Sequence, residues 1–274
     1  MPYPTAFAFE YHSPSQVLEG LVAFHYVLRA GSAPFDETLC ALLGQVQLSF
    51  GGSATYHLPR GPVIAPRLGV IAPTDQAIRM SAPLGFIAIG SALTPVGWTM
   101  LGEGGGSGNR ISTLRSLELQ HALEEPPKAA VSALDRWLTT RLSSAQEDPR
   151  VHLIDDWIVG GGSADVTALS EQLGLSRRSV ERLTRRTHGS TPKRLRAKYR
   201  ALKVAAAIAV GEVADWRLAP AAEGFADQSH FIREFRRYVG VTPGAFMAEP
   251  AGFARRLIEG RWEPGKEIGI AIFA

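Results

Sequence analysis

The stretch Arg185-Arg186-Thr187-His188-Gly189-Ser190-Thr191-Pro192 is matched further on by Arg236-Arg237-Tyr238-Val239-Gly240-Val241-Thr242-Pro243. Both stretches consist of two arginines, two variable residues and then Gly-x-Thr-Pro, so the chain contains an internal duplication near its C-terminus. Each copy ends a segment in which apolar residues recur at helical spacing while arginines occupy the other side. The duplication therefore predicts two similar basic helices in tandem, an arrangement suited to reading DNA.

The first copy has the sequence signals of two helices joined by a tight turn. Asp165 is placed to cap a helix that runs to about Leu173, and Gly174 supplies the left-handed residue that ends it. Ser176 then caps a second helix, which Gly189 stops. The apolar residues of this helix, Val180 and Leu183, face inward and turn outward Arg178, Glu181, Arg182 and Arg185. This geometry lays a second helix in the major groove of DNA.

The second copy repeats the plan, with Gly224-Phe225-Ala226 as the turn and Asp227 as the cap. Aromatic residues (Phe231, Phe235 and Tyr238) form the inner face, and the residues left outward or at the edge are Gln228, His230, Arg233, Arg236 and Arg237. Between the copies, Thr191 as cap and Pro192 at the first helical position begin a long helix that reaches about Val210. Such a spacer would let the two basic helices enter successive major grooves, about 34 Å apart.

The outward residue types suit contact with bases. Arginine can hold guanine with two hydrogen bonds, glutamine can pair with adenine, and glutamate can accept from the amino group of cytosine. The arginines one turn further on, at positions 185, 186, 236 and 237, are predicted to contact phosphates, which makes binding depend on salt. A single arginine is often only a solvated helix face, but the repetition favours a function. His188 is predicted to be a surface residue and His230 a base or phosphate contact.

The charge of the chain is unevenly distributed. Between Ser163 and Pro250 there are 15 Lys plus Arg against 9 Asp plus Glu, a difference of +6. The remainder holds 14 against 17, a difference of −3. Basic residues gathered in the duplicated segment are expected of a protein that binds phosphates, although the same charge can serve solubility.

The N-terminal half has a different pattern. From Tyr3 to about Leu101, short apolar runs alternate with Gly and Pro, which predicts the strands of an antiparallel sandwich or barrel. The clearest runs are Gln45–Phe50, Ala54–Leu58, Gly69–Ala72 and Leu84–Ile89. The glycine-rich segment Gly102–Asn109 is predicted to be a flexible loop.

A helix is predicted over Lys128–Gln146, because its apolar residues (Val131, Leu134, Leu138 and Leu142) recur at spacings of three and four. This stripe is expected to pack on its own domain rather than on a second subunit. Glu147-Asp148-Pro149 breaks the helix, and a domain boundary is predicted near Pro149. The tail from Ala251 ends in an apolar run, Ile268–Phe273, that is expected to dock back onto the protein.

The composition excludes several classes of protein. At 274 residues, 45% apolar and 20% charged, the chain is expected to fold into about two domains. It lacks an apolar run long enough to cross a bilayer, and its first residues do not resemble a secretion signal, so a cytoplasmic location is expected. Cys40 is the only cysteine, which excludes an internal disulfide, and its apolar neighbours indicate a buried side chain rather than a catalytic thiol.

These residues resemble the AraC/XylS family of bacterial transcription regulators. The segment Gly224–Arg237, followed by Gly240-Val241-Thr242-Pro243, is similar to the family signature, and the likeness extends back to about Val151. The helix before Gly224 departs from the family pattern, because Pro220 stands where alanine is usual. That helix is therefore expected to start at Pro220 or to be kinked there.

The resemblance implies an α+β fold, in which a β-rich, cupin-like sandwich or barrel precedes an all-α domain with two helix-turn-helix units. The implied domains are 1–148 for sensing or dimerisation, 149–250 for DNA binding, and 251–274 as a tail. Implied partners are double-stranded DNA, a small-molecule effector, a second copy of the chain and RNA polymerase, with no membrane, metal or cofactor. The candidate DNA-binding residues are Arg178, Ser179, Glu181, Arg182, Arg185, Arg186, Gln228, Ser229, His230, Arg233, Arg236 and Arg237.

Three other classes remain open on the sequence alone. One is a cupin-type enzyme tethered to DNA, but His12, His25 and His57 show no His-x-His pairing, and no triad or paired carboxylates are visible. Another is an architectural protein that binds DNA without regard to sequence. The third is an alkyl-acceptor DNA repair protein, which would need reactive cysteines beside the basic helices, whereas Cys40 stands alone in an apolar stretch.

Overall fold

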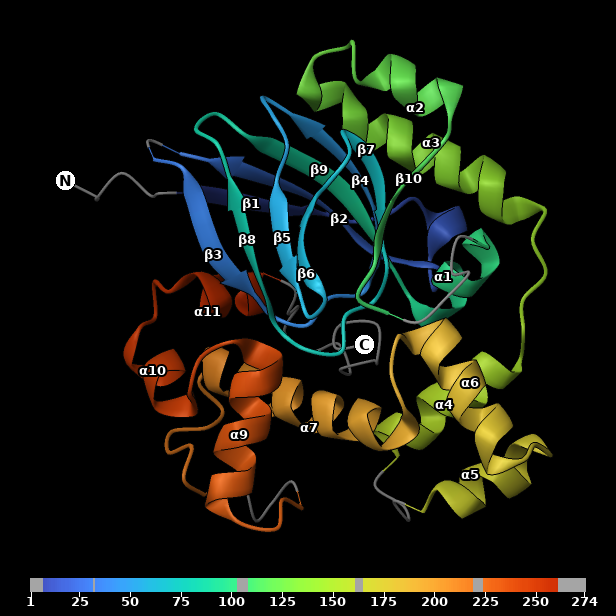
Figure 1. Cartoon of the computed structure of the whole chain (residues 1–274), viewed down its shortest axis with the longest axis vertical. Coiled ribbons are helices and arrows are strands. Elements are labelled where there is room, and N and C mark those ends of the chain that lie inside the picture. Colours follow the sequence, from blue (N-terminus) through green and yellow to red (C-terminus); the bar gives the residue numbers. More distant parts are fainter. Residues whose placement is uncertain (1–6, 32, 103–107, 161–164, 219–223, 261–274) are drawn as a thin grey trace.

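Figure 1 shows a computed structural model of the chain, which describes residues 7–31, 33–102, 108–160, 165–218 and 224–260. A β-sandwich built from the N-terminal part lies on one side, and the helices of the C-terminal part lie on the other. The predicted fold class, a β-rich sandwich followed by a helical domain, is confirmed.

The sandwich consists of two antiparallel sheets that face one another. The first sheet has the order β1 (Phe7–His12), β2 (Val22–Ala30), β9 (Ile87–Leu93), β4 (Gly44–Phe50), β7 (Leu68–Ile71) and β10 (Ile111–Thr113). The second has the order β3 (Phe35–Leu39), β8 (Ile78–Ala82), β5 (Thr55–Leu58) and β6 (Gly61–Ile64). The strand predicted from Leu84 begins only at Ile87, because Gly85 takes a φ of 76° in a turn closed by Phe86 N–H and Pro83 O.

The first sheet is buried on both faces. On β4, Val46 and Leu48 belong to the core formed with α1 (Pro95–Leu101), α2 (Leu117–Ala122) and α3 (Ala130–Ser143), while Gln45 and Gln47 point into the sandwich. The predicted helix over 128–146 is α3, preceded by the 3₁₀ turn η2 (Pro127–Ala129). Its residues Leu134, Leu138 and Leu142 are buried in this same core beside the 3₁₀ turn η1 (Gln16–Leu18), so the stripe packs on its own domain as expected.

The helical part follows the predicted order. It contains α4 (Arg150–Val159), α5 (Val166–Leu173), α6 (Arg177–His188), α7 (Pro192–Ala209), α9 (Gln228–Val239), α10 (Pro243–Ala248) and α11 (Phe253–Glu259). The carboxylates of Asp165 and Asp227 and the hydroxyl of Ser176 cap α5, α9 and α6, as their positions in the sequence predict. Gly174, Gly189 and Gly240 end their helices in the left-handed conformation.

Two loops of the sandwich, residues 40–43 and 72–77, contact the helical part, and we call them the docking loops. The N–H groups of Ala41 and Ala77 donate to Tyr238 O and Arg237 O, both at 2.7 Å. These two carbonyls end α9 and have no partner within the helix, so the sandwich satisfies groups that would otherwise be unpaired. The sandwich therefore fixes the C-terminal end of α9.

The tail begins with a helix that sequence analysis did not predict, α11, which contacts β3 and α7. Three predictions fall outside the described residues: the docking of Ile268–Phe273, the effect of Pro220, and most of the glycine-rich loop between Gly102 and Asn109. None of the described helices combines the length and the apolar character needed to span a bilayer.

Candidate nucleic-acid interface

Helix α6 separates an apolar face from a basic one. Val180 and Leu183 are buried, as predicted, and they pack this helix into the core of the helical part. The polar residues on the opposite side divide by exposure: Arg178, Arg182, Arg185 and Arg186 are exposed, while Ser179 and Glu181 are half-buried. Ser176 Oγ accepts from the N–H of Ser179 and lies 3.0 Å from its hydroxyl, so Ser179 belongs to the cap of the helix.

Helix α9 repeats this division with aromatic residues. Phe231, Phe235 and Tyr238 are buried, as predicted. Gln228, Ser229, Arg233 and Arg236 are exposed, and His230 and Arg237 are half-buried. The ring of His230 stands edge-on to Phe225, with centroids 5.7 Å apart, and Arg237 lies over the ring of Tyr238 at 5.7 Å.

Five exposed arginines of these two helices have no ion-pair partner in the part of the chain that the structure describes. In the described part of the chain, no carboxylate lies within 4.0 Å of the guanidinium of Arg178, Arg182, Arg185, Arg233 or Arg236. Elsewhere arginines do find such partners; Arg194, for example, lies 2.9 Å from Asp75. Among the described residues, these five arginines therefore present positive charge without an ion-pair partner, which favours binding of phosphates.

His188 is buried, with 2% of its surface exposed, so the prediction that it lies on the surface is wrong. Its Nε2 lies 2.6 Å from Asp155 Oδ1 on α4, and its Nδ1 lies 2.6 Å from Thr187 Oγ1. The helical period from Val180 through Leu183 places positions 187 and 188 on the inward face, and the neighbouring arginines obscure this signal. His188 therefore holds the last turn of α6 onto α4.

The spacer helix α7 positions both basic helices. At about 1.5 Å per residue, its 18 residues span about 27 Å. Figure 1 shows α6 near one end of α7 and α9 near the other. Both basic helices direct their C-terminal ends toward the sandwich, where Gly189 lies against Pro73 and Gly240 against Thr38. Their N-terminal ends, which carry Arg178 and Gln228, lie away from the sandwich.

Two arginines of α7 pack against aromatic rings of the helical part. The guanidinium of Arg200 lies 4.7 Å from the centre of the Phe225 ring and donates to Gly224 O at 2.7 Å. Arg196 lies 5.0 Å from the centre of the Trp157 ring on α4. These cations therefore stabilise the turn of the second unit and the packing of α4, at positions where sequence analysis assigned no role.

The sandwich contains a buried histidine that sequence analysis left unpartnered. His25 Nδ1 lies 2.7 Å from Ser91 Oγ, and Nε2 lies 3.0 Å from Asp135 Oδ1 on α3. The arrangement resembles a catalytic triad, but Ser91 has no exposed surface and His25 only 1%, so no substrate can reach the hydroxyl. Burial outweighs the effect of Asp135 and lowers the pKa of His25. The cluster ties α3 to the sheet.

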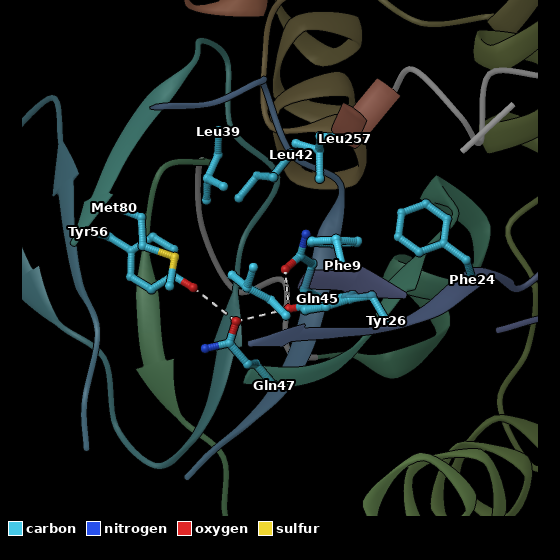
Figure 2. A pocket seen from close by; sticks show the side chains of 11 residues that line it. Phe9, Phe24, Tyr26, Leu39, Leu42, Gln45, Gln47, Tyr56, Met80 and Leu257 are labelled. Atoms are coloured by element: carbon cyan, nitrogen blue, oxygen red, sulfur yellow. Dashed lines mark hydrogen bonds between the residues drawn. The ribbon is translucent and has the colours of Figure 1, made fainter. Parts of the chain in front are cut away.

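A small cavity lies between the two sheets. Its walls are formed mainly by Phe9, Phe24, Leu39, Leu42, Met80 and Leu257, and Figure 2 shows Tyr26, Tyr56, Gln45 and Gln47 directed into the same space. Leu39 and Leu42 lie in or beside the docking loop 40–43, and Leu257 belongs to α11. The cavity is therefore enclosed by elements of both halves of the molecule.

Two capped helices with exposed basic faces, held at the two ends of one spacer helix, have the arrangement of a double helix-turn-helix domain. A family model described as a helix-turn-helix domain matches residues 169–249. The match covers both basic helices and the spacer helix between them, so this part of the chain is similar to helix-turn-helix domains.

Some solved structures are similar to this chain at low sequence identity. ToxT from Vibrio cholerae strain SCE256, bound to an unsaturated fatty acid, is 10% identical, with a TM-score of 0.50 over 90% of this chain and 97% of that chain. ToxT from Vibrio cholerae O395 is 10% identical, with a TM-score of 0.49 over 90% and 99%. The AraC-like transcriptional activator CuxR is 10% identical, with a TM-score of 0.30 over 71% and 85%. A comparison with curated proteins found no significant match.

Proposed function

We propose that the protein is a sequence-specific regulator of transcription that acts on cytoplasmic DNA. The observation that carries the proposal is the pair of exposed basic faces on α6 and α9 at the two ends of α7, whose five named arginines have no ion-pair partner among the described residues. Arg178, Glu181, Arg182, Gln228, Ser229, His230 and Arg233 contact bases, with Ser179 at the edge of this set. Arg185, Arg186, Arg236 and Arg237 contact phosphates, which position the protein without selecting a sequence.

We further propose that residues 1–148 sense a small-molecule effector, that residues 149–250 bind DNA, and that residues 251–274 form a C-terminal tail. The cavity between the sheets supports the first assignment, because it lies inside the sandwich and shares residues with the docking loop 40–43. A ligand bound there would displace the docking loop 40–43, whose Ala41 N–H donates to Tyr238 O at the end of α9. Dimerisation and contact with RNA polymerase, which the family resemblance implies, complete the proposal.

Selection of binding sites from a random DNA library at fixed salt tests the proposal. Enrichment of one sequence motif is expected for the native chain, and an R182A/R233A double variant should enrich none, because both substitutions remove exposed base-contacting groups. An R136A/R141A variant, altered at two exposed arginines of α3, serves as the matched control and should select the native motif. Equal binding to unrelated duplexes would instead indicate an architectural protein.

A further inference from the structure

The turn that precedes α9 is attached to the spacer helix through Arg200. The guanidinium of Arg200 donates to Gly224 O at 2.7 Å and lies 4.7 Å from the centre of the Phe225 ring. Arg200 stands in the middle of α7, a helix that is buried along much of its length. The turn is therefore held against a rigid part of the molecule.

The Phe225 ring connects this turn to the first turn of α9. Phe225 is buried, and its ring stands edge-on to His230 and Phe231, with centroids 5.7 and 5.0 Å apart. The carboxylate of Asp227 caps the same turn by accepting from the N–H of His230 at 2.7 Å. This first turn carries three of the proposed base contacts, Gln228–His230. The position of Phe225 therefore determines where these side chains lie.

The two ends of α9 are held by different parts of the molecule. The docking loops bond to Arg237 O and Tyr238 O at its C-terminal end, whereas its N-terminal end lies away from the sandwich (Figure 1). At about 1.5 Å per residue, its 12 residues span about 18 Å, so a tilt of about 5° around the docked end moves the first turn by about 1.5 Å. Donor and acceptor atoms must lie about 2.7–3.2 Å apart, so such a displacement breaks hydrogen bonds to bases. Arg200 thus holds the end of α9 at which a small tilt has its largest effect.

In the described part of the chain, the turn of the first helix-turn-helix unit has no such support from α7. It is closed by its own backbone, since the N–H of Leu175 donates to Ser170 O at 3.0 Å. An added Cβ at Gly174 would meet no atom within 4 Å, whereas one at Gly224 would lie 3.5 Å from Nη1 of Arg200. The contact of Arg200 with a turn is therefore specific to the second unit.

We infer that Arg200 is a positioning residue, which sets the base preference of α9 without touching DNA itself. It acts through Phe225 on the first turn of α9 and leaves α6 unaffected. This inference rests on the proposed function. It adds a determinant of specificity that lies on the spacer helix, outside both basic helices.

Site selection with R200M tests the inference, because methionine keeps an unbranched apolar stem and removes both the donor and the charge. The positions of the motif that α9 reads are those that R233A relaxes, and those that α6 reads are relaxed by R182A. In R200M, discrimination against single-base variants should fall from tenfold or more to about twofold at the α9 positions and stay unchanged at the α6 positions. R217M, which alters an exposed arginine 5.5 Å from the centre of the Trp216 ring, is the matched control and should select the native motif.

The salt dependence of binding separates positioning from two other roles. Arg236 lies near the docked end of α9, so its phosphate contact, and with it the slope of log affinity against log salt, should be unchanged in R200M. A slope reduced by about 0.9 with the base preference intact would show that Arg200 binds a phosphate, and would overturn the inference. Loss of both would also overturn it, because the whole second unit, and not its first turn, would then depend on Arg200. R200K keeps the cation and should restore part of the preference.

The F225L variant tests the path from Arg200 to α9. It should reproduce the effect of R200M, and the R200M/F225L double variant should discriminate no worse than either, because both changes act on the same turn. Additive losses would overturn the path through Phe225. If the native chain selects no motif, the proposed function fails; if the native chain and R200M select the same motif, only this inference fails.

Discussion

Arg182 and Arg185 lie on the same basic face of α6, roughly one turn apart, and both are exposed. Their different distances from the N-terminal end of the helix predict different roles. We expect R182A to reduce the free energy of binding to the selected site by about 1–3 kcal/mol and to relax the base preference at one position. Electrophoretic mobility or fluorescence anisotropy titrations, with the selected site and with single-base variants of it, measure both effects.

R185A provides the contrast on the same helix. We expect it to weaken binding to all duplexes to a similar extent and to reduce the slope of log affinity against log salt by about 0.9, because one phosphate contact is lost. Titrations at four salt concentrations measure the slope. If R182A changed the salt slope and left the base preference intact, the assignment of the two arginines would have to be exchanged.

His25 predicts how the stability of the sandwich depends on pH. Asp135 only accepts, so Nε2 carries the hydrogen of the neutral ring and Nδ1 accepts from Ser91. Because burial lowers the pKa of His25, the folded chain resists a proton that the unfolded chain takes up below about pH 6.5. The free energy of unfolding should therefore fall as the pH drops from 7 to 5, by up to about 1.4 kcal/mol per pH unit from this residue.

Urea unfolding of the native chain and of H25Q at several pH values measures this contribution as the difference between two slopes. H121Q, which alters an exposed histidine of α2, is the matched control. The pKa of Asp135 is also lowered, since hydrogen bonds from Ser15 and His25 outweigh the effect of its partial burial. Its contribution lies at more acidic pH, below about 4, and does not overlap this window. Identical slopes for the native chain and H25Q would contradict the prediction.

At the scale of elements, the starts of helices were predicted best where the capping residue directly precedes the helix in the sequence. Asp165, Ser176 and Asp227 cap the helices that begin at the next residue, so position in the chain was sufficient. Four strands of the sandwich, β4, β5, β7 and β9, were predictable as short apolar runs between Gly and Pro. Helix α11 was not, because its apolar face is matched by Phe7 and Phe35, more than 200 residues earlier.

The glycines that end α5 and α9 predict a measurable difference between two helix ends. Gly174 has a φ of 62°, and an added Cβ there would meet no atom within 4 Å. Gly240 has a φ of 98°, and its Cβ would lie 2.5 Å from Thr38 Cγ2 in the sandwich. We expect G174A to lower the free energy of unfolding by about 1 kcal/mol through backbone strain alone. G240A should lower it by about 2–4 kcal/mol, since overpacking adds to the strain.

Denaturant unfolding of both variants measures the two losses. A T38S substitution removes the methyl group that the new Cβ would meet, so it should restore part of the stability of G240A and leave G174A unaffected. Equal losses of stability for G174A and G240A would show that the contact between α9 and the sandwich accommodates the added Cβ without a further cost.

At the scale of the whole molecule, the relation between the two halves could not be predicted from the sequence. The bonds that join them connect residues far apart in the chain, such as Ala41 with Tyr238 and Asp75 with Arg194. Neither partner in these pairs stands out by type or spacing. Within the candidate site, the exposed arginines could be predicted from helical periodicity. The burial of His188 could not, because it depends on Asp155, and the cavity could not, because its side chains come from both halves.

Lys198 links the halves at their centre. It lies on α7, is only 1% exposed, and its Nζ donates to Thr74 O at 3.2 Å and to Leu42 O at 3.4 Å. These carbonyls belong to the two docking loops, which also bond to each other through Leu42 N–H and Thr74 Oγ1. A buried lysine is unusual unless it is paired, so its presence indicates that this junction depends on it.

The K198M variant should weaken this junction while keeping a side chain of similar shape. Removing the ammonium takes its donor from Thr74 O, at a cost of about 1–3 kcal/mol, while Leu42 O still accepts from the N–H of Thr74 at 3.0 Å. Because that loss falls at the junction and not within either core, we expect differential scanning calorimetry to show the sandwich and the helical part unfolding in two separated transitions, where the native chain shows one. K193M, which alters an exposed lysine on the same helix, should retain the native single transition. A single transition for K198M, at an unchanged temperature, would mean that the N–H groups of Ala41 and Ala77 hold the halves together without it.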